Sequence, residues 1–422
     1  MTTSARWPTT TIGELFAIGA GKTLNAVART TEPKHPFLRT SNVLWGRLNL
    51  GEVDRMHYTD DDLRNKTLEP GDLLVCEGGD IGRAAVWDGS ISSCGFQNHL
   101  HRLRPRVSGV VPAFFMYALQ AGFTLHARYE GAGNRTTIPN LSRGRLENLE
   151  VPLPPTDEQK HIAGILALVQ HAIELESRSL AALQELRETT MTRVFAGGLA
   201  RHELIETELG ALPGHWDVAP LGEVCTLVSG GTPSKAEPAY WKGSIPWASP
   251  KDIKLPRLRD TEDHISEDGL AAGSKLVPAG SVLVVVRGMI LMRDVPVALA
   301  DVAMAINQDL KAIIPGPRLD SAYLLYAITA FKGRLFQKVG RSAHGTRTLL
   351  SHELSGFLIP IPSRSEQEEI AALLTTIDQS CVAHQRRHDA LRDLFTGLLD
   401  KLLSGELPVE TLERDTTEVI SA

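Results

Sequence analysis

The sequence predicts a mixed α/β protein made of two globular domains and two long helices that are related by an internal repeat. A motif of helix-entry residues occurs twice, 208 positions apart, and each copy continues into a long stretch of helical periodicity. The segments before the copies hold short apolar runs separated by Gly, Pro, Asp and Asn. At 422 residues the chain is long enough for two or three separate cores.

The repeat is clearest at the entries to the predicted helices. Val151–Leu166 recurs as Ile359–Leu374, so that Glu158–Gln159 aligns with Glu366–Gln367. Further pairs keep the same offset, namely Leu183 with Leu391, Leu186 with Leu394, Gly197 with Gly405 and Leu199 with Leu407. Upstream, Trp7 corresponds to Trp216, and Pro70–Val75 resembles Pro278–Val284 with one residue inserted. Agreement over this length indicates duplication of a whole unit.

The repeat predicts where the parts of the chain begin and end, because each unit runs from a globular part into a helical part. The predicted parts are a first domain (1–150), a central helical region (151–199), a linker (200–215), a second domain (216–357), a distal helical region (358–407) and a C-terminal tail (408–422).

Within the domains, the apolar runs Leu73–Cys76 and Val282–Val286 are typical of buried strands. Ala113–Ala121 and Ser321–Phe331 predict helices. Each domain is therefore expected to be mixed α/β.

Two long helices are predicted after the domains. Thr156–Gln159 and Ser365–Glu368 both fit the capping-box pattern at a helix start. Apolar residues then follow a 4-3 spacing typical of a coiled-coil seam, at Ile162, Leu166, Val169, Ile173, Leu180 and Leu183 and at Ile370, Leu374, Ile377, Cys381, Leu391 and Phe395. Gly197–Gly198 and Gly405 mark the ends, which gives spans of about 60 Å at about 1.5 Å per residue. Each helix could pack only on its own domain, but the length and the seam favour pairing.

Composition limits the classes of function. The apolar run Val282–Met292 is interrupted by Arg287 and Gly288, and Met1–Trp7 has no leader pattern, so we expect a cytoplasmic protein without a membrane partner. The cysteines, Cys76, Cys94, Cys225 and Cys381, are scattered and predict free thiols, without a disulfide framework or a zinc site.

The charge is unevenly distributed, although the formal net charge is −6. Residues 1–147 hold 17 Lys+Arg against 14 Asp+Glu, and residues 216–355 hold 16 against 14, so the acidic excess lies in the connecting segments. Two clusters are strongly basic. Seven arginines lie between Arg102 and Arg145 with a single acid, Glu130, and Lys332, Arg334, Lys338, Arg341 and Arg347 lie in a stretch without acids. Such clusters attract phosphate.

No catalytic, metal or cofactor site is predicted in the chain. An adenine methyltransferase needs an Asn/Asp-Pro-Pro-aromatic loop, and Leu153–Thr156 has only its prolines. Glu77–Arg83 is rich in glycine but lacks the Lys-Ser/Thr ending of a nucleotide loop. His99 and His101 have no further ligands at useful spacing.

The candidate functional residues are therefore DNA readers, because Arg binds phosphate or guanine bidentately and Asn and Gln bind adenine in the same way. For each of them an ordinary solvated or turn role is the alternative. The candidates are Arg39, Asn42, Arg83, Gln97, Asn98, Arg135, Thr136, Arg143, Lys251, Gln308, Lys338, Arg341, Thr346 and Arg347.

With these residues in view, the chain resembles the specificity subunits of type I restriction-modification systems over essentially its whole length. The two Pro-x-Pro-x3-Glu-Gln helix entries, at Pro152–Gln159 and Pro360–Gln367, and the linker Glu208–Trp216 carry the resemblance. It implies that residues 1–150 and 216–357 are target-recognition domains, and that the two helices pair antiparallel as a spacer.

The resemblance also implies the function and the partners. The chain would be a non-catalytic subunit that recognises a bipartite, asymmetric site in double-stranded DNA. Two methyltransferase subunits would join through the helices, and an endonuclease/translocase subunit would complete the restriction form. S-adenosylmethionine is expected in the methyltransferase subunit, and no cofactor is expected in this chain.

Two other functions remain open. A stand-alone DNA-binding regulator would share the basic domains but need no methyltransferase partner. A self-contained methyltransferase or nuclease is a weaker alternative, because the residues that it would need are absent from the sequence.

Overall fold

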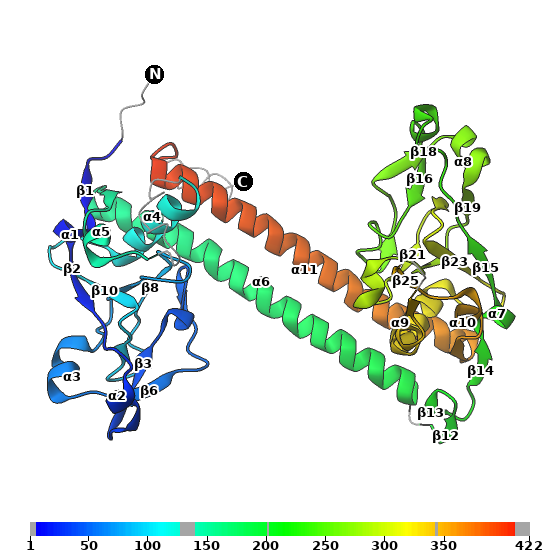
Figure 1. Ribbon diagram of the computed structural model, residues 1–422, viewed down its shortest axis with the longest axis horizontal. Helices are drawn as coiled ribbons and strands as arrows, with labels where there is room; N and C mark the ends of the chain where they lie inside the picture. The colour runs from blue at the N-terminus through cyan, green and yellow to red at the C-terminus, as the bar shows by residue number, and fades with distance from the viewer. Residues whose placement is uncertain (1–5, 127–139, 201, 342–344, 410–422) are drawn as a thin grey trace, which may run out of the picture. The chain divides into compact units, whose positions relative to one another are not determined.

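Each half of the protein combines one α/β domain with segments of both long helices. The computed structural model describes residues 6–126, 140–200, 202–341 and 345–409. The chain divides into two compact units, Met1–Ser177 with Arg386–Ala422 and Arg178–Gln385. The helices α6 (Thr156–Gly197) and α11 (Arg364–Ser404) each run without a break and contribute to both units (Figure 1).

The first domain is built around a four-stranded sheet with the order β2-β10-β7-β8 and a three-stranded sheet with the order β6-β3-β9. Its strands are β1 (Thr9–Thr11), β2 (Phe16–Ala20), β3 (Lys34–Leu38), β4 (Val43–Leu44), β5 (Arg47–Leu48), β6 (Asp54–His57), β7 (Leu73–Cys76), β8 (Ala84–Val86), β9 (Gly95–Phe96), β10 (Leu100–Pro105) and β11 (Glu150–Pro152). Its helices are α1 (Ile12–Leu15), α2 (Ala26–Thr30), the 3-10 turn η1 (Thr40–Asn42), α3 (Asp60–Lys66), α4 (Pro112–Thr124) and α5 (Arg143–Glu147).

The second domain has sheets with the orders β15-β23-β20-β21-β17 and β18-β16-β22-β19. Its strands are β14 (Asp217–Pro220), β15 (Cys225–Ser229), β16 (Ile245–Ala248), β17 (Arg257–Leu258), β18 (Asp263–Ile265), β19 (Lys275–Val277), β20 (Val282–Val285), β21 (Val297–Ala300), β22 (Met304–Ile306), β23 (Leu310–Pro315), β24 (Gly340–Arg341), β25 (Arg347–Thr348) and β26 (Leu358–Ile361). Its helices are α7 (Leu221–Val224), η2 (Pro238–Trp241), α8 (Glu267–Gly273), η3 (Met289–Met292), α9 (Ser321–Gln337) and α10 (Ser351–Ser355). A hairpin, β12 (Leu204–Thr207) and β13 (Gly210–Pro213), precedes the domain.

The two domains share one topology, which is the internal repeat in three dimensions. The order β2-β10-β7-β8 corresponds to β15-β23-β20-β21, and β6-β3-β9 corresponds to β18-β16-β22. The predicted strands are present as β7 and β20, and both are fully buried. The predicted helices are present as α4 and α9, and each extends beyond its predicted end. The mixed α/β class is confirmed.

Each sheet packs against a helix through large apolar side chains. In the first domain Phe114 and Phe115 of α4 are buried, and Phe115 meets Phe16 of β2 edge to face at 5.5 Å between ring centroids. In the second domain Tyr323 and Tyr326 of α9 are buried in the core below the central strands. Their position fixes the sheets against the start of each long helix.

Within each unit the two long-helix segments lie antiparallel. In the first unit Glu176 of α6 pairs with Arg387 of α11 at 3.3 Å, while Leu166, earlier on α6, shares a buried cluster with Leu399, later on α11. In the second unit Arg187 of α6 pairs with Asp378 of α11. The predicted helix pairing is therefore confirmed inside both units.

The helix ends also follow the repeat. Met191, Val194 and Phe195 near the end of α6 are buried in the second unit, in the cluster that contains Tyr323. Their counterparts 208 positions later, Leu399, Leu402 and Leu403 near the end of α11, are buried in the first unit. Each domain core thus contains the start of the helix that follows it and the end of the other helix.

The capping boxes expected at Thr156–Gln159 and Ser365–Glu368 are wrong in detail. Thr156 and Ser365 lie inside their helices, and Glu368 pairs with Arg364 at 2.8 Å. The side chain of Gln159 accepts a hydrogen bond from Val111 N at 3.0 Å and donates to Pro154 O at 2.9 Å. Gln367 likewise accepts from Asp320 N at 2.8 Å and donates to Pro362 O at 2.9 Å. Both amides are buried and satisfy carbonyls and N–H groups of the domain, so they attach each helix to its domain rather than cap it.

The glutamate beside each glutamine has an equally repeated role. The indole N–H of Trp7 donates to Glu158 at 2.9 Å, and that of Trp216 donates to Glu366 at 3.1 Å. The Trp at the start of each domain therefore binds the first turn of the long helix that follows that domain. This contact explains why Trp and Glu-Gln recur together in both halves of the sequence.

The remaining general predictions concern cysteines and membranes. All four cysteines are free thiols, and Cys76 and Cys94 are buried. Among the residues that the structure describes, every helix is too short or too polar to cross a lipid bilayer.

Candidate nucleic-acid interface

The candidate readers of the first domain gather where two neighbouring parallel strands end. Strands β3 and β9 pair Phe37 with Gly95 and Leu38 with Phe96. Arg39 follows β3 directly, and Gln97 and Asn98 follow β9. The Gln97 N–H donates to Leu38 O at 2.9 Å, which keeps the two strand ends together. We call these residues, with Asn42 and Arg83, the first strand-end cluster.

The second domain places its candidates at the same point. Strands β16 and β22 are parallel and pair Ala248 with Ile306. Asn307 follows β22, and its N–H donates to Ala248 O at 2.9 Å, as Gln97 N–H does to Leu38 O. Lys251 and Gln308 lie in the segments that leave these strands, and we call them the second strand-end cluster. The same edge of the fold therefore carries different side chains in the two domains.

A line of backbone contacts joins the second strand-end cluster to a short ribbon of arginines. Asp309, next to Gln308, accepts hydrogen bonds from the N–H groups of Val286 and Arg287 at the end of β20. Arg287 in turn forms a bridge with Thr348 of β25. In the ribbon β24–β25, Arg341 lies directly opposite Arg347.

The arginine ribbon, Arg341 and Arg347, concentrates positive charge. Directly opposed residues of an antiparallel pair share one face, and like charges placed in this way destabilise the pair. Arg341 is exposed, Arg347 is partly exposed, and within the described part of the chain neither forms an ion pair. An anion between the two guanidinium groups would remove the repulsion, and phosphate oxygens match them in geometry.

The first domain has equivalent backbone contacts, which can be followed as far as Asn140, where the described residues resume. The N–H of Glu77, after β7, donates to His99 O at 3.0 Å, and His99 follows Asn98. Gly78 bridges Asn140, as Arg287 bridges Thr348. The predicted readers Arg135 and Thr136 precede Asn140 and lie outside the described residues.

Three residues of the first cluster are engaged by other groups of the protein. Asn42 is buried, donates to Asn49 O and Glu52 O, both at 2.8 Å, and accepts from Arg39 N. These bonds occupy the amide and give it a role in holding the loop. Arg39 pairs with Asp54 at 3.0 Å, and Arg83 pairs with Asp80 at 3.1 Å and donates to Thr40 O. Gln97 and Asn98 have no side-chain hydrogen bond within the described residues.

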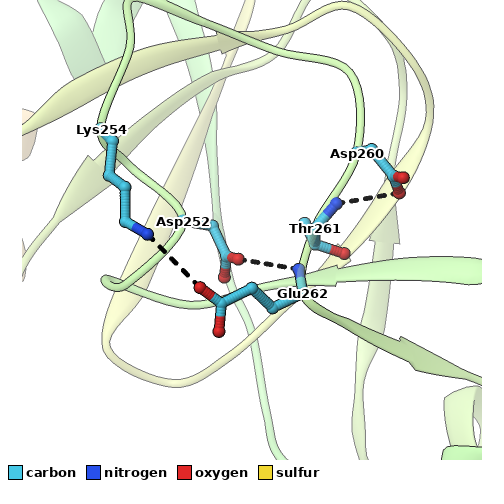
Figure 2. A pocket seen from close by; sticks show the side chains of 5 residues that line it. All are labelled: Asp252, Lys254, Asp260, Thr261 and Glu262. Carbon is cyan, nitrogen blue, oxygen red and sulfur yellow. Dashed lines mark hydrogen bonds and ion pairs between the residues drawn. The ribbon is translucent and has the colours of Figure 1, made fainter. Parts of the chain in front are cut away.

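Lys251 of the second cluster is paired with acids at the rim of a small pocket. It contacts Glu262 at 3.0 Å and Asp263 at 2.9 Å. The hydrogen bonds that Lys251 donates to Asp263 and to Glu262, in this order of size, raise the pKa of Lys251. The pocket, of about 280 Å³, is lined by Asp252, Lys254, Asp260, Thr261 and Glu262. Figure 2 shows the backbone N–H of Glu262 directed at Asp252 and its carboxylate at Lys254. Its acids make this pocket a poor place for phosphate.

The other candidates lie on exposed turns and helix ends. Gln308 is exposed and accepts a hydrogen bond from Thr232. Lys338 follows α9 directly and lies 3.6 Å from Glu353, and Thr346 precedes β25. Arg143 begins α5 and pairs with Glu147 at 2.8 Å. The structure brings Thr346 beside the arginine ribbon but gives Arg143 no place in the strand-end cluster.

The basic cluster expected between Arg102 and Arg145 is partly structural. Arg104 of β10 donates through Nε and Nη2 to the buried carboxylate of Asp72, at 2.7 Å each, and these hydrogen bonds raise its pKa. Arg102 donates to the carbonyls of Asn65 and Thr67, and Arg106 to that of Gly13. These three arginines hold the sheet and are not free to take up phosphate.

Sequence reasoning missed two cations at the strand ends. Lys22 bridges Gln97 and is paired with Asp62, and Arg287 lies beside the arginine ribbon. Arg287 could have been found, because it is the first charged residue after a buried strand, at the position where the first half has Gly78. Lys22 carries no comparable signal.

The fold defines a class of protein with two related α/β domains. Each domain packs on one pair of antiparallel helix segments and carries polar side chains at the same edge of the fold. The chain belongs to the family of type I restriction modification DNA specificity domains, whose model matches residues 5–185 and 213–391. The match occurs twice and agrees with the internal repeat. The predicted family is therefore confirmed.

Individual relatives agree with this assignment. The chain is 31% identical over 251 residues to the specificity subunit of the type I restriction enzyme EcoR124I/EcoR124II of Escherichia coli, an alignment that covers 59% of each chain. It is 24% identical to the MjaVIII specificity subunit of Methanocaldococcus jannaschii over 309 residues, which cover 71% of this chain and 70% of the relative. The alignment with the first of these relatives thus spans less than two thirds of its length.

Solved structures show the same fold. The S subunit of a type I restriction-modification system from M. genitalium superposes with a TM-score of 0.64 at 17% identity, covering 96% of this chain and 97% of the other. At this identity the likeness extends to the fold and not to individual readers of DNA.

Proposed function

We propose that the chain is the DNA-reading subunit of a type I restriction-modification complex and that it recognises a bipartite, asymmetric site in double-stranded DNA. The observation that carries the proposal is the paired strand-end edge. Both domains present it through the same strand pairing, with Gln97 and Asn98 in one and Gln308 in the other. Two domains with the same fold and different side chains at this edge suit a DNA site whose two halves differ in sequence.

The long helices support the spacer role in this proposal. Both are continuous over about 60 Å at about 1.5 Å per residue. Two readers attached to such elements would recognise two short sequences at a set separation, and binding would be sharpened because both must engage together.

The helices also offer matched surfaces for partner subunits. Leu186 of α6 and Leu394 of α11 occupy equivalent places in the repeat, and their exposed fractions are 50% and 49%. We take these two equivalent, half-exposed leucines as the candidate contacts for two identical subunits. These would be methyltransferase subunits, which carry S-adenosylmethionine, and endonuclease subunits would join the assembled complex.

The test is to co-express the chain with the methyltransferase subunit of its system and to sequence the methylated positions in host DNA. A motif of two short parts with a fixed gap is expected. Replacing residues 216–357 by the second domain of another specificity subunit should change one part and leave the other intact. A single uninterrupted motif, or a change in both parts, would contradict the proposal.

The same co-expression also tests the alternative that the chain is a stand-alone DNA-binding regulator. Such a protein would bind DNA but would neither co-purify with a methyltransferase subunit nor direct methylation. A methyltransferase or nuclease within the chain itself would modify or cut DNA without any partner.

A further inference from the structure

Two histidines and a glutamate converge at the base of the hairpin β12–β13, in the second unit. His202 precedes the hairpin and His215 follows it, and the rings are 4.3 Å apart between centroids. Leu204 pairs with Pro213 and Gly214 N–H donates to Glu203 O, so the two histidines stand at facing positions one step further out. Glu366, in the first turn of α11, completes the group.

The three side chains present metal-binding atoms to one point. One ligand atom from each lies within 4.8 Å of the other two, and His215 Nε2 is 3.0 Å from Glu366 Oε2. Ligands of a tetrahedral Zn²⁺ lie about 2.0–2.2 Å from the ion and so about 3.4 Å from each other. The His202 side chain is exposed.

The carboxylate of Glu366 is oriented as metal ligands usually are. Trp216 Nε1 donates to Oε2 at 3.1 Å, which fixes the group from behind. The other oxygen, Oε1, is buried and has no hydrogen-bond partner among the described residues. This oxygen lies close to the backbone of Gly198, directly after α6, since a Cβ at that position would be 3.2 Å from it. A buried carboxylate oxygen without a partner needs a cation or a donor.

The first unit shows what occupies the same place when histidines are absent. There Glu158 accepts from Trp7 in the same way, but Arg6, the residue before the Trp, lies 2.7 Å from Glu158 Oε1. In the second unit the residue before the Trp is His215, so the permanent positive charge of an arginine is replaced by imidazoles. The internal repeat thus points to a cation at this position in both units.

We propose that His202, His215 and Glu366 bind one Zn²⁺ ion, with solvent in the fourth position because both imidazoles are exposed. The ion would tie the linker hairpin to the first turn of α11. Imidazole nitrogen and carboxylate oxygen together suit Zn²⁺ rather than Mg²⁺ or Ca²⁺, which prefer oxygen alone. The proposal does not depend on DNA recognition.

The test uses the full chain without a polyhistidine tag, stripped with a chelator and dialysed against Zn²⁺. We expect one ion per chain by elemental analysis, and a visible absorption band of four-coordinate Co²⁺ when Co²⁺ replaces Zn²⁺. His202→Ala and His215→Ala should each abolish both signals. His352→Ala, which removes an exposed histidine elsewhere in the second unit, should leave both unchanged, as should Glu158→Gln in the first unit.

The wild-type and His202→Ala proteins decide the question, because His202 is exposed and its loss leaves the Trp216–Glu366 contact intact. If the wild-type chain binds no Zn²⁺, the proposal is wrong. Binding of equal stoichiometry in His202→Ala and His215→Ala would place the ion elsewhere and would overturn it as well.

Discussion

Asp378 of α11 holds Arg187 of α6 with one carboxylate oxygen, while its other oxygen accepts a hydrogen bond from Tyr326 at 2.9 Å. Asp378 is buried, so this contact joins both helices and the second domain in a setting of low dielectric constant. At the equivalent place in the first unit, Gln170 accepts from Tyr117 at 2.9 Å, and Phe395 packs on the Tyr117 ring. The repeat therefore uses an ion pair in one unit and neutral groups in the other.

Removing one member of this ion pair should destabilise the second unit strongly. Arg187→Ala leaves a buried carboxylate without its cation, a change that costs about 3–5 kcal/mol in comparable sites. Urea unfolding should show this loss. Glu185→Ala, two residues before Arg187 and exposed, should change the free energy of unfolding by less than about 0.5 kcal/mol. Equal effects of the two variants would mean that the pair contributes nothing.

Substitutions in the arginine ribbon should weaken DNA binding without lowering the stability of the protein. Arg341→Ala and Arg347→Ala should each weaken binding of cognate DNA by about 1–3 kcal/mol if the contact is bidentate, and should lower the slope of affinity against salt by about one ion. The free energy of unfolding should not fall, because each change relieves repulsion between opposed cations. Fluorescence anisotropy at several salt concentrations measures the first effect.

Arg318→Ala is the matched control for the ribbon, since Arg318 belongs to the same unit but is paired with Asp217. It should leave DNA affinity unchanged. Arg135→Ala in the first half, by contrast, should weaken DNA binding by about 1–3 kcal/mol, as Arg347→Ala should in the second half. Unchanged affinity in Arg135→Ala and Arg347→Ala would remove both from the set of readers.

The matched leucines predict the stoichiometry of the complex. Leu186→Glu and Leu394→Glu should each reduce the number of methyltransferase subunits per chain from two to one, because a carboxylate placed in an apolar contact is costly to desolvate. Native mass spectrometry of the co-expressed complex measures this number. Leu255→Glu, at an equally exposed leucine away from the helices, should retain both subunits. Retention of two subunits in all three variants would locate the docking surface elsewhere.

The buried thiols predict slow chemistry in the folded protein. Burial raises the pKa of Cys76 to about 11 and that of Cys94 to about 12, so that at pH 8 almost none of either is thiolate. Iodoacetamide at this pH should leave both unmodified for as long as the first unit stays folded, and should label all four cysteines in guanidinium chloride. Mass spectrometry of peptides gives the result, and rapid labelling of native Cys76 would contradict the buried position.

Much of the fold could be predicted because the repeat is visible in local patterns. The strand at Leu73–Cys76 and the helix at Ser321 were marked by apolar runs and turn residues. The role of Gln159 could not be predicted, because its partner Val111 N lies 48 positions earlier and is brought there only by folding. A glutamine three residues into a helix looks like a cap when nonlocal donors are unknown.

In the candidate site too, residue types could be predicted from the sequence, but the contacts that distinguish the residues could not. Residue type alone made Asn42 and Gln97 equal candidates. Folding separated them, since the carbonyls of Asn49 and Glu52 enclose Asn42 while no described group binds the Gln97 side chain. Which arginine meets which acid, as Arg104 meets Asp72, depends on strand register and leaves no trace in the sequence.

The end of each long helix is buried in the core of the unit that contains the other domain, and this affects the order in which the units can fold during synthesis. The core of the first unit contains Leu399, Leu402 and Leu403, which leave the ribosome only after the whole of the second unit. The second unit, by contrast, has all of its residues by Gln385 and can close while the chain is still growing. The half that is made first is thus the half that matures last, and a premature stop after α9 would harm the amino-terminal domain although that domain had been translated in full.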